Sequence, residues 1–386
     1  MSETVGAASA SAEADAAVVE AFVRTAPADD LLALTAALVD VPSESHHEAH
    51  LADLVEARLA GRAGALDVTR VADNVVVRTH LGRERRVVLG GHLDTVPANG
   101  NDRATIDGDV VHGVGAADMK GGLAVLLRLA EELAAAPADG AGAPRHDVTI
   151  VLYEGEEVAD EFNGLRHVLE VQPDLLAADF AVLLEPTDGW VEAGCQGFLI
   201  VRAEFDGERA HTARPWMGVN AIHRASAALA RVAAHESDTV RVDGLEFRES
   251  LQAVRMEGGV TGKHNVVPDT CALVVNRRFA PAYSAEEARE QVEALLADAD
   301  RVEVLQAQPA AAPNLANPLV ADFVTGLELP VRPKLGWTDV ARFASRGVPA
   351  VNFGPGDPTI AHTAGELVTR AGVERCYEVL ARFVGL

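Results

Sequence analysis

Residues 86–97 read RVVLGGHLDTVP, in which an apolar run, RVVLGG (86–91), is followed closely by a histidine and an aspartate. A continuous apolar run of this length predicts a strand that is buried on both faces. Similar runs occur at NVVVRT (74–79), DVTIVLY (147–153), DFAVLLE (179–185) and VPAVNFG (348–354). The segment MKGGLAVLLRLAEELAAA (119–136) predicts a helix between two of these strands. Buried strands that alternate with helices indicate an α/β domain with a mixed, mostly parallel sheet sandwiched by helices.

A different pattern begins near residue 198. Strands are predicted at FLIVRAEFDG (198–207), ESLQAVRMEGG (249–259), TCALVVNRRFA (270–280) and VEVLQAQ (302–308), and helices at GVNAIHRASAALARVAAHE (218–236) and SAEEAREQVEALLADA (284–299). The order is β-α-β-β-α-β, which is the ferredoxin-like arrangement. We therefore expect an inserted domain at 198–306 within a main domain formed by 26–197 and 307–386. Residues 1–25 are expected to form a flexible leader.

The composition excludes several classes of function. The chain of 386 residues has 58 acidic and 33 basic residues, and its formal charge is −25. Such a chain is not built to coat nucleic acid or an anionic membrane, because both need a basic face. It has no apolar run of about 18 residues, so no membrane span is expected. The three cysteines form no CxxC pair, and the chain is expected to be cytoplasmic.

Polar residues follow each of the predicted strands. In open α/β sheets, ligands bind beyond the carboxyl ends of the strands. Residues placed at such ends, or just before a helix that joins two strands, should therefore point into one region. The residues in question are His92, Asp118, Glu156, Glu157, Glu185 and His362.

Two histidines and several carboxylates without cysteine form a ligand set for zinc, cobalt or manganese in a catalytic site. His92 and Glu185 fit one metal ion, and His362 and Glu157 fit a second. Asp118 fits between them as a bridging carboxylate. Two ions about 3.5–4 Å apart can activate a water molecule and polarise a carbonyl group. The sequence thus predicts two divalent metal ions, with zinc expected and cobalt or manganese as alternatives.

Two further carboxylates fit supporting roles. Glu156 stays outside the ligand set, and it can take a proton from water and pass it to a leaving amine. Asp94, two residues after His92, fits a partner that holds the imidazole in one tautomer. Each piece alone has a simpler interpretation, such as a structural histidine or a solvated turn. The segment GVGAADMKGG (113–122) also resembles a phosphate loop, but it lacks the GK[ST] ending and does not match GxGxxG.

The motifs taken together resemble the dizinc aminoacylase and carboxypeptidase family. They are GHLDTVP (91–97), GAADMKGG (115–122), the pairs Glu156-Glu157 and Glu185-Pro186, and GPG…AH (354–362). The resemblance runs in one order over about 30–386, and it implies the metal ligands and the general base assigned above. It also implies a cis peptide bond between Asp118 and Met119. The inserted domain falls where the family carries its lid or dimerisation domain.

The resemblance also implies roles for residues of the inserted domain and its surroundings. His211 matches a histidine that stabilises the oxyanion in the active site of a partner subunit, so a homodimer through the lid is expected. Asn265 and Thr338 match residues that contact substrate, the latter with Asp339 beside it. Arg278 matches an arginine that binds a substrate carboxylate, a role that suits a guanidinium group. Since Arg277 and Arg278 alternate along one strand, only one of them can face the substrate.

The resemblance implies a metal-dependent hydrolase of a linear amide, acting on a small N-acyl amino acid. The segments 333–358, 263–281 and 208–224 most resemble the members that remove a succinyl group from a diamino acid. Members that remove acetyl from ornithine or release glutamate are the alternative. A succinyl group ends in a carboxylate that needs a cation, whereas acetyl does not. A non-catalytic binding protein of the same fold is a third hypothesis, against which the presence of Glu156 argues.

Overall fold

The computed structural model describes residues 17, 20–21, 23–24, 29–60, 66–259 and 261–386. Most of the leader predicted at 1–25 lies outside these residues. The chain divides into two compact units. The first contains the described residues up to Glu192 together with 315–332 and 346–386, and the second contains 193–314 and 333–345. The domain boundaries predicted at 198 and 306 stay a prediction.

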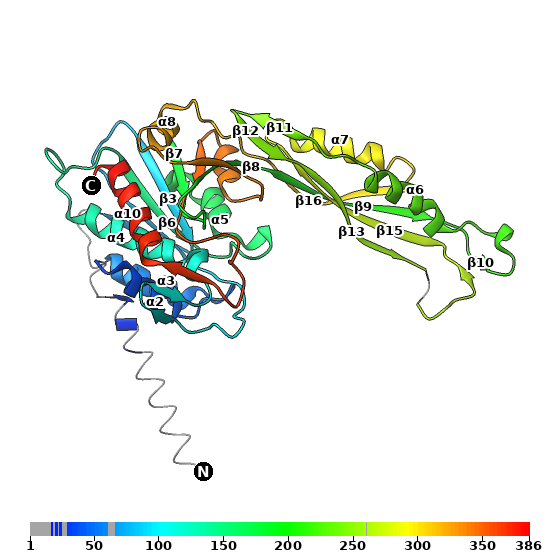
Figure 1. Cartoon of the computed structure of the whole chain (residues 1–386), viewed down its shortest axis with the longest axis horizontal. Helices are drawn as coiled ribbons and strands as arrows, with labels where there is room; N and C mark the ends of the chain where they lie inside the picture. The colour runs from blue at the N-terminus through cyan, green and yellow to red at the C-terminus, as the bar shows by residue number, and fades with distance from the viewer. Residues whose placement is uncertain (1–16, 18–19, 22, 25–28, 61–65, 260) are drawn as a thin grey trace, which may run out of the picture. The chain divides into compact units, whose positions relative to one another are not determined.

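The first unit contains most of an eight-stranded sheet, whose strands β8 and β17 end in the second unit (Figure 1). In spatial order its strands are β1 (Asp67–Val71), β2 (Asn74–Arg78), β6 (Asp147–Tyr153), β3 (Arg86–His92), β7 (Phe180–Leu183), β18 (Ala350–Asn352), β8 (Val191–Cys195) and β17 (Val331–Lys334). The four strands β6, β3, β7 and β18 run parallel to one another, and β1 and β2 are antiparallel. The predicted mixed, mostly parallel sheet is therefore confirmed.

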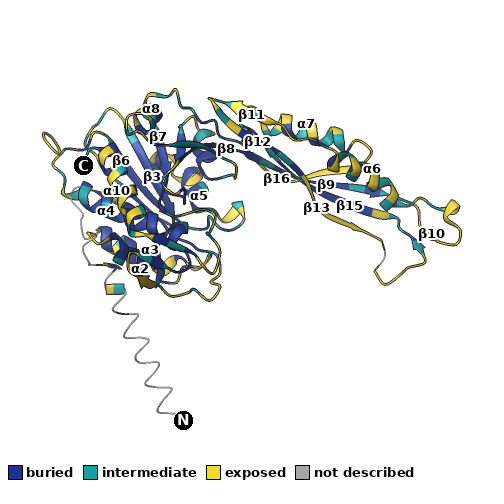
Figure 2. Cartoon of the chain, in the orientation of Figure 1, coloured by how far each residue is buried: buried dark blue, intermediate teal, exposed yellow. Residues whose placement is uncertain are grey.

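Helices pack around this sheet. They are α2 (Leu31–Val39), α3 (Ala49–Ala60), α4 (Gly121–Ala135), α5 (Gly164–Val171), α8 (Pro318–Val324) and α10 (Arg370–Val384). α4 contacts β3 and β6, and α2 and α10 pack against α4, whereas α3 and α5 contact β2. All seven residues of β6 are buried, as are six of the seven in β3. This burial explains why their sequences are continuous apolar runs rather than alternating ones (Figure 2).

A small sheet that the sequence patterns did not reveal lies in the same unit. It consists of β19 (Leu367–Thr369), β5 (Val110–His112) and β4 (Thr105–Asp107), in that order. Each strand has only three residues, which is too short for a period-two pattern to be recognised. β19 pairs antiparallel with β5, and so joins the end of the chain to the segment that precedes α4.

The second unit contains a four-stranded antiparallel sheet in the order β13-β15-β9-β16. Its elements are β9 (Gly197–Asp206), α6 (Ala221–Ala233), β13 (Ser250–Gly258), β15 (Thr270–Phe279), α7 (Ala285–Leu295) and β16 (Arg301–Gln308). This order confirms the ferredoxin-like arrangement. Alternate residues of β9 are buried together with small side chains of α6, so one face of the sheet is covered by helix. The unit also holds β10 (Ala210–His211), β11 (Thr239–Val242), β12 (Leu245–Arg248), β14 (Val266–Val267) and α9 (Val340–Ala344).

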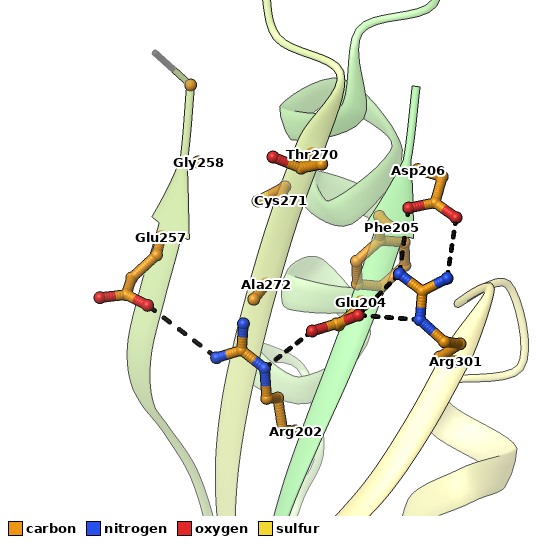
Figure 3. A pocket seen from close by; sticks show the side chains of 11 residues that line it. Arg202, Glu204, Phe205, Asp206, Glu257, Gly258, Thr270, Cys271, Ala272 and Arg301 are labelled. Carbon is orange, nitrogen blue, oxygen red and sulfur yellow. Dashed lines mark hydrogen bonds and ion pairs between the residues drawn. The ribbon is translucent and has the colours of Figure 1, made fainter. Parts of the chain in front are cut away.

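Charged side chains line a hollow of about 320 Å³ on the same sheet (Figure 3). Arg301 lies directly opposite Glu204 in the register, 2.8 Å from its carboxylate, and 3.3 Å from that of Asp206. Arg202 pairs with Glu204 at 3.0 Å and with Glu257 at 3.9 Å. Both arginines thus have carboxylate partners on the surface of the sheet.

No helix among the described residues is long and apolar enough to cross a membrane.

Candidate metal centre

The parallel strands β6, β3 and β7 end at one edge of the main sheet. Predicted metal ligands lie at these ends or directly after them. β3 ends at His92, whose neighbour in the register is Tyr153, the last residue of β6. The loop 154–157 therefore leaves the sheet beside His92. On the other side of β3, the backbone N–H of Leu184 donates to a β3 carbonyl at 2.8 Å. Glu185 follows directly and is buried at the same edge.

The turn between β5 and α4 carries Asp118. Its peptide bond to Met119 is cis, which confirms the prediction. The buried Met119 places its sulfur 3.3 Å from the backbone nitrogen of His92. A Cβ atom at Gly91 would collide with the terminal methyl group of Met119, and one at Gly122 would lie 2.8 Å from it. Two glycines therefore make the slot that holds this methionine beside the end of β3.

The carboxylate of Asp118 lies between two histidines. Its Oδ1 is 3.0 Å from Nε2 of His92, and its Oδ2 is 3.4 Å from Nε2 of His362. Glu157 Oε1 is 2.8 Å from the same nitrogen of His362. One ligand atom from each of His92, Asp118 and Glu157 lies within 4.8 Å of the others. Each oxygen of Asp118 thus faces a different imidazole, as a bridging carboxylate requires.

These contacts shift the ionisation of the histidines. Hydrogen bonds to Asp118 and Glu157 raise the pKa of His362 to about 10. Burial acts to lower the pKa of His92, but the hydrogen bonds and charges of Asp118 and Asp94 outweigh it and raise the pKa well above its usual value. The opposing histidines lower the pKa of Asp118 against its burial. The carboxylates therefore favour a cation on the imidazole nitrogens, whether a proton or a metal ion.

The donor set fits divalent metal ions of the zinc type. Imidazole nitrogens and carboxylate oxygens suit zinc, cobalt and manganese, and the buried histidine His92 has its ring fixed from the far side. Its Nδ1 lies 3.0 Å from the backbone carbonyl of Asp94 and 3.5 Å from the Asp94 carboxylate. When Nδ1–H donates to that carbonyl, Nε2 is left to bind a metal.

Asp94 has a second contact that the sequence did not reveal. Its Oδ1 accepts the backbone N–H of Glu156 and its Oδ2 accepts that of Glu157, both at 3.0 Å. Ser45 Oγ donates to the same carboxylate at 2.8 Å. Burial acts to raise the pKa of Asp94, but the hydrogen bond and charge of His92, with smaller contributions from the bonds of Glu157 and Ser45, lower it. One fully buried carboxylate therefore holds the loop that carries both the predicted base and a predicted ligand.

Gly155, the residue before Glu156, has a backbone conformation and surroundings that leave no room for a side chain. Gly155 has φ +67°, and a Cβ at this position would collide with the carbonyl oxygen of Phe162. Its N–H donates to the buried carboxylate of Glu48 at 3.1 Å. A glycine is therefore needed at position 155. The half-buried Glu156 comes next, in a loop whose consecutive backbone N–H groups are hydrogen-bonded.

The predicted oxyanion donor His211 and the predicted substrate residue Asn265 are neighbours in the second unit. His211 belongs to β10, which pairs with β14, and Asn265 directly precedes β14. The N–H of Thr212 donates to the carbonyl of Asn265 at 3.0 Å. Nδ1 of the exposed His211 accepts the N–H of Ala213 at 3.0 Å, so Nε2 carries the hydrogen and is a donor. That tautomer suits the predicted contact with an oxyanion.

Arg277 and Arg278 lie on opposite faces of β15. Arg277 is buried and its guanidinium pairs with Glu249 at 2.6 Å. Arg278 lies over the ring of Phe198, 4.9 Å from the ring centroid, and burial lowers its pKa. Phe198 in turn meets Trp337 edge to face at 6.1 Å. Arg278 is therefore held by an aromatic wall, whereas Arg277 is occupied by a structural ion pair.

The remaining predicted residue, Thr338, is buried at the start of α9 in the second unit, with the fully buried Asp339 beside it. The structure thus places the predicted metal ligands, Asp94 and Glu156 in the first unit. It places the predicted substrate residues in the second.

Two buried charged residues near the metal ligands were missed by the sequence reasoning. Glu366 accepts the backbone N–H groups of Ala117 and Asp118. Lys120 donates to the carbonyl of Val41 at 2.8 Å, and burial lowers its pKa to about 7. A signal for Lys120 was available, because it is one of only three lysines in the chain and directly follows the Asp118 turn.

A family comparison covers most of the chain. The profile described as peptidase family M20/M25/M40 matches residues 88–385. The chain belongs to this family. It is an M20 hydrolase, and the resemblance found in the sequence motifs is confirmed.

Close relatives of this M20 hydrolase carry one name. A protein of Mycobacterium tuberculosis described as a candidate succinyl-diaminopimelate desuccinylase is 45% identical over 357 residues, which cover 92% of this chain and 98% of the relative. The succinyl-diaminopimelate desuccinylase of Corynebacterium glutamicum is 42% identical over 358 residues, covering 91% and 94%.

Solved M20 structures share the fold at lower identity. Aminopeptidase PepT from Bacillus cereus has a TM-score of 0.74 at 20% identity, covering 93% of this chain and 98% of the other. The YXEP protein of Bacillus subtilis, described as a dinuclear metal binding peptidase, has a TM-score of 0.65 at 15% identity, covering 92% and 96%. At these identities the likeness establishes the fold.

Proposed function

We propose that the protein is a succinyl-diaminopimelate desuccinylase. It would hydrolyse N-succinyl-LL-2,6-diaminopimelate to succinate and LL-2,6-diaminopimelate, a step in the synthesis of lysine and cell-wall precursors. The observation that carries this proposal is the 45% identity to a relative described by that activity, in a match that covers 98% of the relative. The cluster of His92, Asp118 and Glu157 supports it, because amide hydrolysis in this family depends on such a centre.

The proposed metal ligands divide into two sets that share one residue. His92 and Glu185 would hold one ion, His362 and Glu157 the other, and Asp118 would bridge the two. When bound, two divalent cations polarise the scissile carbonyl and make water a stronger nucleophile at neutral pH. Zinc is expected, and cobalt and manganese suit the same ligands.

The protein's own groups would move the proton and steady the charge that develops. Glu156 would take a proton from water and deliver it to the leaving amine. His211, whose Nε2 carries hydrogen, would donate to the oxyanion. In the proposed homodimer, formed through the second unit, this histidine comes from the partner subunit. A cytoplasmic location is also proposed, and the three cysteines are free and buried.

Substrate recognition is assigned to the second unit. Arg278 would bind the terminal carboxylate of the succinyl group, with Asn265 and Thr338 as further contacts. Arg278 suits this role because its guanidinium is stacked on Phe198 and, among the described residues, no ion pair to it is found. An arginine held in this way presents its donor fork with little loss of side-chain entropy.

Replacing Arg278 with methionine should separate succinyl from acetyl substrates. We expect kcat/KM for succinyl-diaminopimelate to fall roughly 10- to 100-fold, because a hydrogen bond to a charged group is lost. For acetylornithine the change should stay within about threefold, since acetyl has no carboxylate. Arg202→Met is the matched control, because Arg202 lies on the same sheet with its own carboxylate partners. Equal losses on both substrates would contradict the assignment.

A substrate panel tests the function as a whole. The zinc-loaded protein is assayed with succinyl-diaminopimelate, acetylornithine and N-acyl glutamates, and kcat/KM is compared. The proposal expects succinyl-diaminopimelate to be preferred by at least about tenfold. A preference for acetylornithine or for a glutamate substrate would assign the protein instead to one of those activities of the same family.

A further inference from the structure

A buried carboxylate outside the predicted site contacts the bridging residue through its backbone. Glu366 is 1% exposed, and its Oε1 accepts the N–H groups of Ala117 and Asp118, each at 3.0 Å. These are consecutive peptide groups, and the second belongs to the residue whose side chain lies between His92 and His362. Among the described residues of the metal centre, Glu366 thus accepts hydrogen bonds from main-chain donors.

Glu366 also belongs to the segment that carries His362. It follows that histidine by four residues, and its own N–H donates to the carbonyl of Thr363 at 3.2 Å. Its carbonyl accepts the N–H of Gly113 at 3.2 Å. The next residue begins β19, which pairs with β5. Side chain and backbone of one residue thus tie the His362 segment to the turn that presents Asp118.

The arrangement repeats what Asp94 does elsewhere in the centre. Asp94 accepts the N–H groups of Glu156 and Glu157, and Glu366 accepts those of Ala117 and Asp118. In both cases a buried carboxylate binds two consecutive N–H groups, one of which belongs to a proposed ligand. A bond to the N–H of a ligand fixes its Cα and therefore the direction from which its side chain reaches the metal.

We propose that Glu366 is a positioning residue for the metal centre, which holds Asp118 so that its two oxygens face His92 and His362. This inference rests on the proposed metal centre. The essential property of Glu366 is an acceptor oxygen at the end of a side chain of this length. Glutamine should therefore substitute for it, whereas leucine should not.

Zinc affinity of the metal-free protein tests the inference. Dissociation constants for both ions are measured by competition with a chromogenic chelator. For Glu366→Leu we expect them to rise roughly 10- to 100-fold, the usual effect of losing a group that orients a ligand. For Glu366→Gln they should stay within about threefold, because one amide oxygen can accept both N–H groups. A leucine variant with unchanged affinity overturns the proposal.

Asp147 provides a matched control. This buried carboxylate also accepts two loop N–H groups, from Leu81 at 2.7 Å and Arg83 at 2.9 Å, but it begins β6 and lies at the opposite end of that strand from the metal ligands. Asp147→Asn should leave zinc affinity unchanged even if it lowers thermal stability. A loss of zinc affinity equal to that of Glu366→Leu would show a general effect of stability, and would overturn the proposal.

A milder variant keeps the test decisive if the leucine protein does not fold. Glu366→Asp retains the charge but withdraws the acceptor by one methylene group, so an intermediate rise in the dissociation constants is expected. Unchanged affinity of this variant overturns the proposal. Zinc binding by the parent protein separates a failure of the proposed metal centre from a failure of the proposed role of Glu366. If the folded parent binds no zinc, the proposed metal centre is wrong. If the parent binds two ions and the Glu366 variants bind them equally well, only the proposed role of Glu366 is wrong.

Discussion

Replacing Glu156 with glutamine is expected to lower kcat for succinyl-diaminopimelate roughly 10²- to 10⁴-fold while the protein keeps two metal ions per chain. Glutamine matches glutamate in size but cannot take a proton from water. The loop itself should stay in place, because it is held by its backbone. The N–H of Glu156 donates to Asp94, and the N–H of the preceding Gly155 donates to Glu48.

The measurement combines steady-state kinetics with elemental analysis of the same samples. Glu154→Gln is the matched control, because Glu154 belongs to the same loop but its carboxylate is bound to Asn74 at 2.9 Å and to the N–H of Asp73 at 3.3 Å. Its kcat should remain within a few-fold of the parent. Equal rates for Glu156→Gln and the parent would exclude Glu156 as the base. A loss of metal would show that it acts as a ligand instead.

Replacing Asp118 with asparagine should remove the paired metal site. The bound metal should fall from two ions to at most one, and kcat/KM should fall by roughly 10³-fold or more, because metal ions supply several kcal/mol of stabilisation in such reactions. The reason is geometric. The two oxygens of Asp118 face Nε2 of His92 and Nε2 of His362. An amide keeps only one oxygen and turns a donor NH2 group toward the other position.

Glu157→Gln gives the informative contrast. Glu157 Oε1 lies 2.8 Å from Nε2 of His362 and is assigned to one ion, so its replacement should weaken that ion and leave the other bound. Calorimetric titration with zinc would show one tight site for Glu157→Gln, and weakened binding at both sites for Asp118→Asn. If Asp118→Asn retained two tight sites, Asp118 would not be the bridge.

Much of the main domain could be predicted because its strands are buried on both faces. The expected run 147–153 coincides with β6, and the run 86–91 with all but the last residue of β3. The rule that ligands gather at the carboxyl ends of parallel strands then brought His92 and the loop 154–157 to one edge. The same rule placed His362, which follows the run 348–354, and Asp118, which precedes the helix predicted at 119–136, and the structure brings both of them to His92 and Glu157.

The parts that escaped prediction depend on contacts without a periodic pattern. β19, β5 and β4 have three residues each, and β11 and β12 have four, so these strands are too short to be recognised from a period-two pattern, and β19 pairs with β5 from a distant part of the chain. Asp94 was expected to hold the His92 ring, yet the backbone carbonyl of Asp94 lies closer to that ring and its carboxylate binds backbone N–H groups. A backbone N–H group can come from any residue type except proline, so a side chain that binds such groups cannot be matched to its partners from the sequence.

The slot that holds Met119 has a consequence for how this sequence can vary. Gly91 and Gly122 exclude any Cβ that would meet the methionine methyl group, and Met119 is joined directly to Asp118. A larger residue at position 91 requires the methionine side chain to move or position 119 to become smaller. We expect either change alone to lower activity, because Met119 is joined directly to Asp118. The two positions should therefore behave as an epistatic pair, with double replacements found more often among descendants of this gene than single ones.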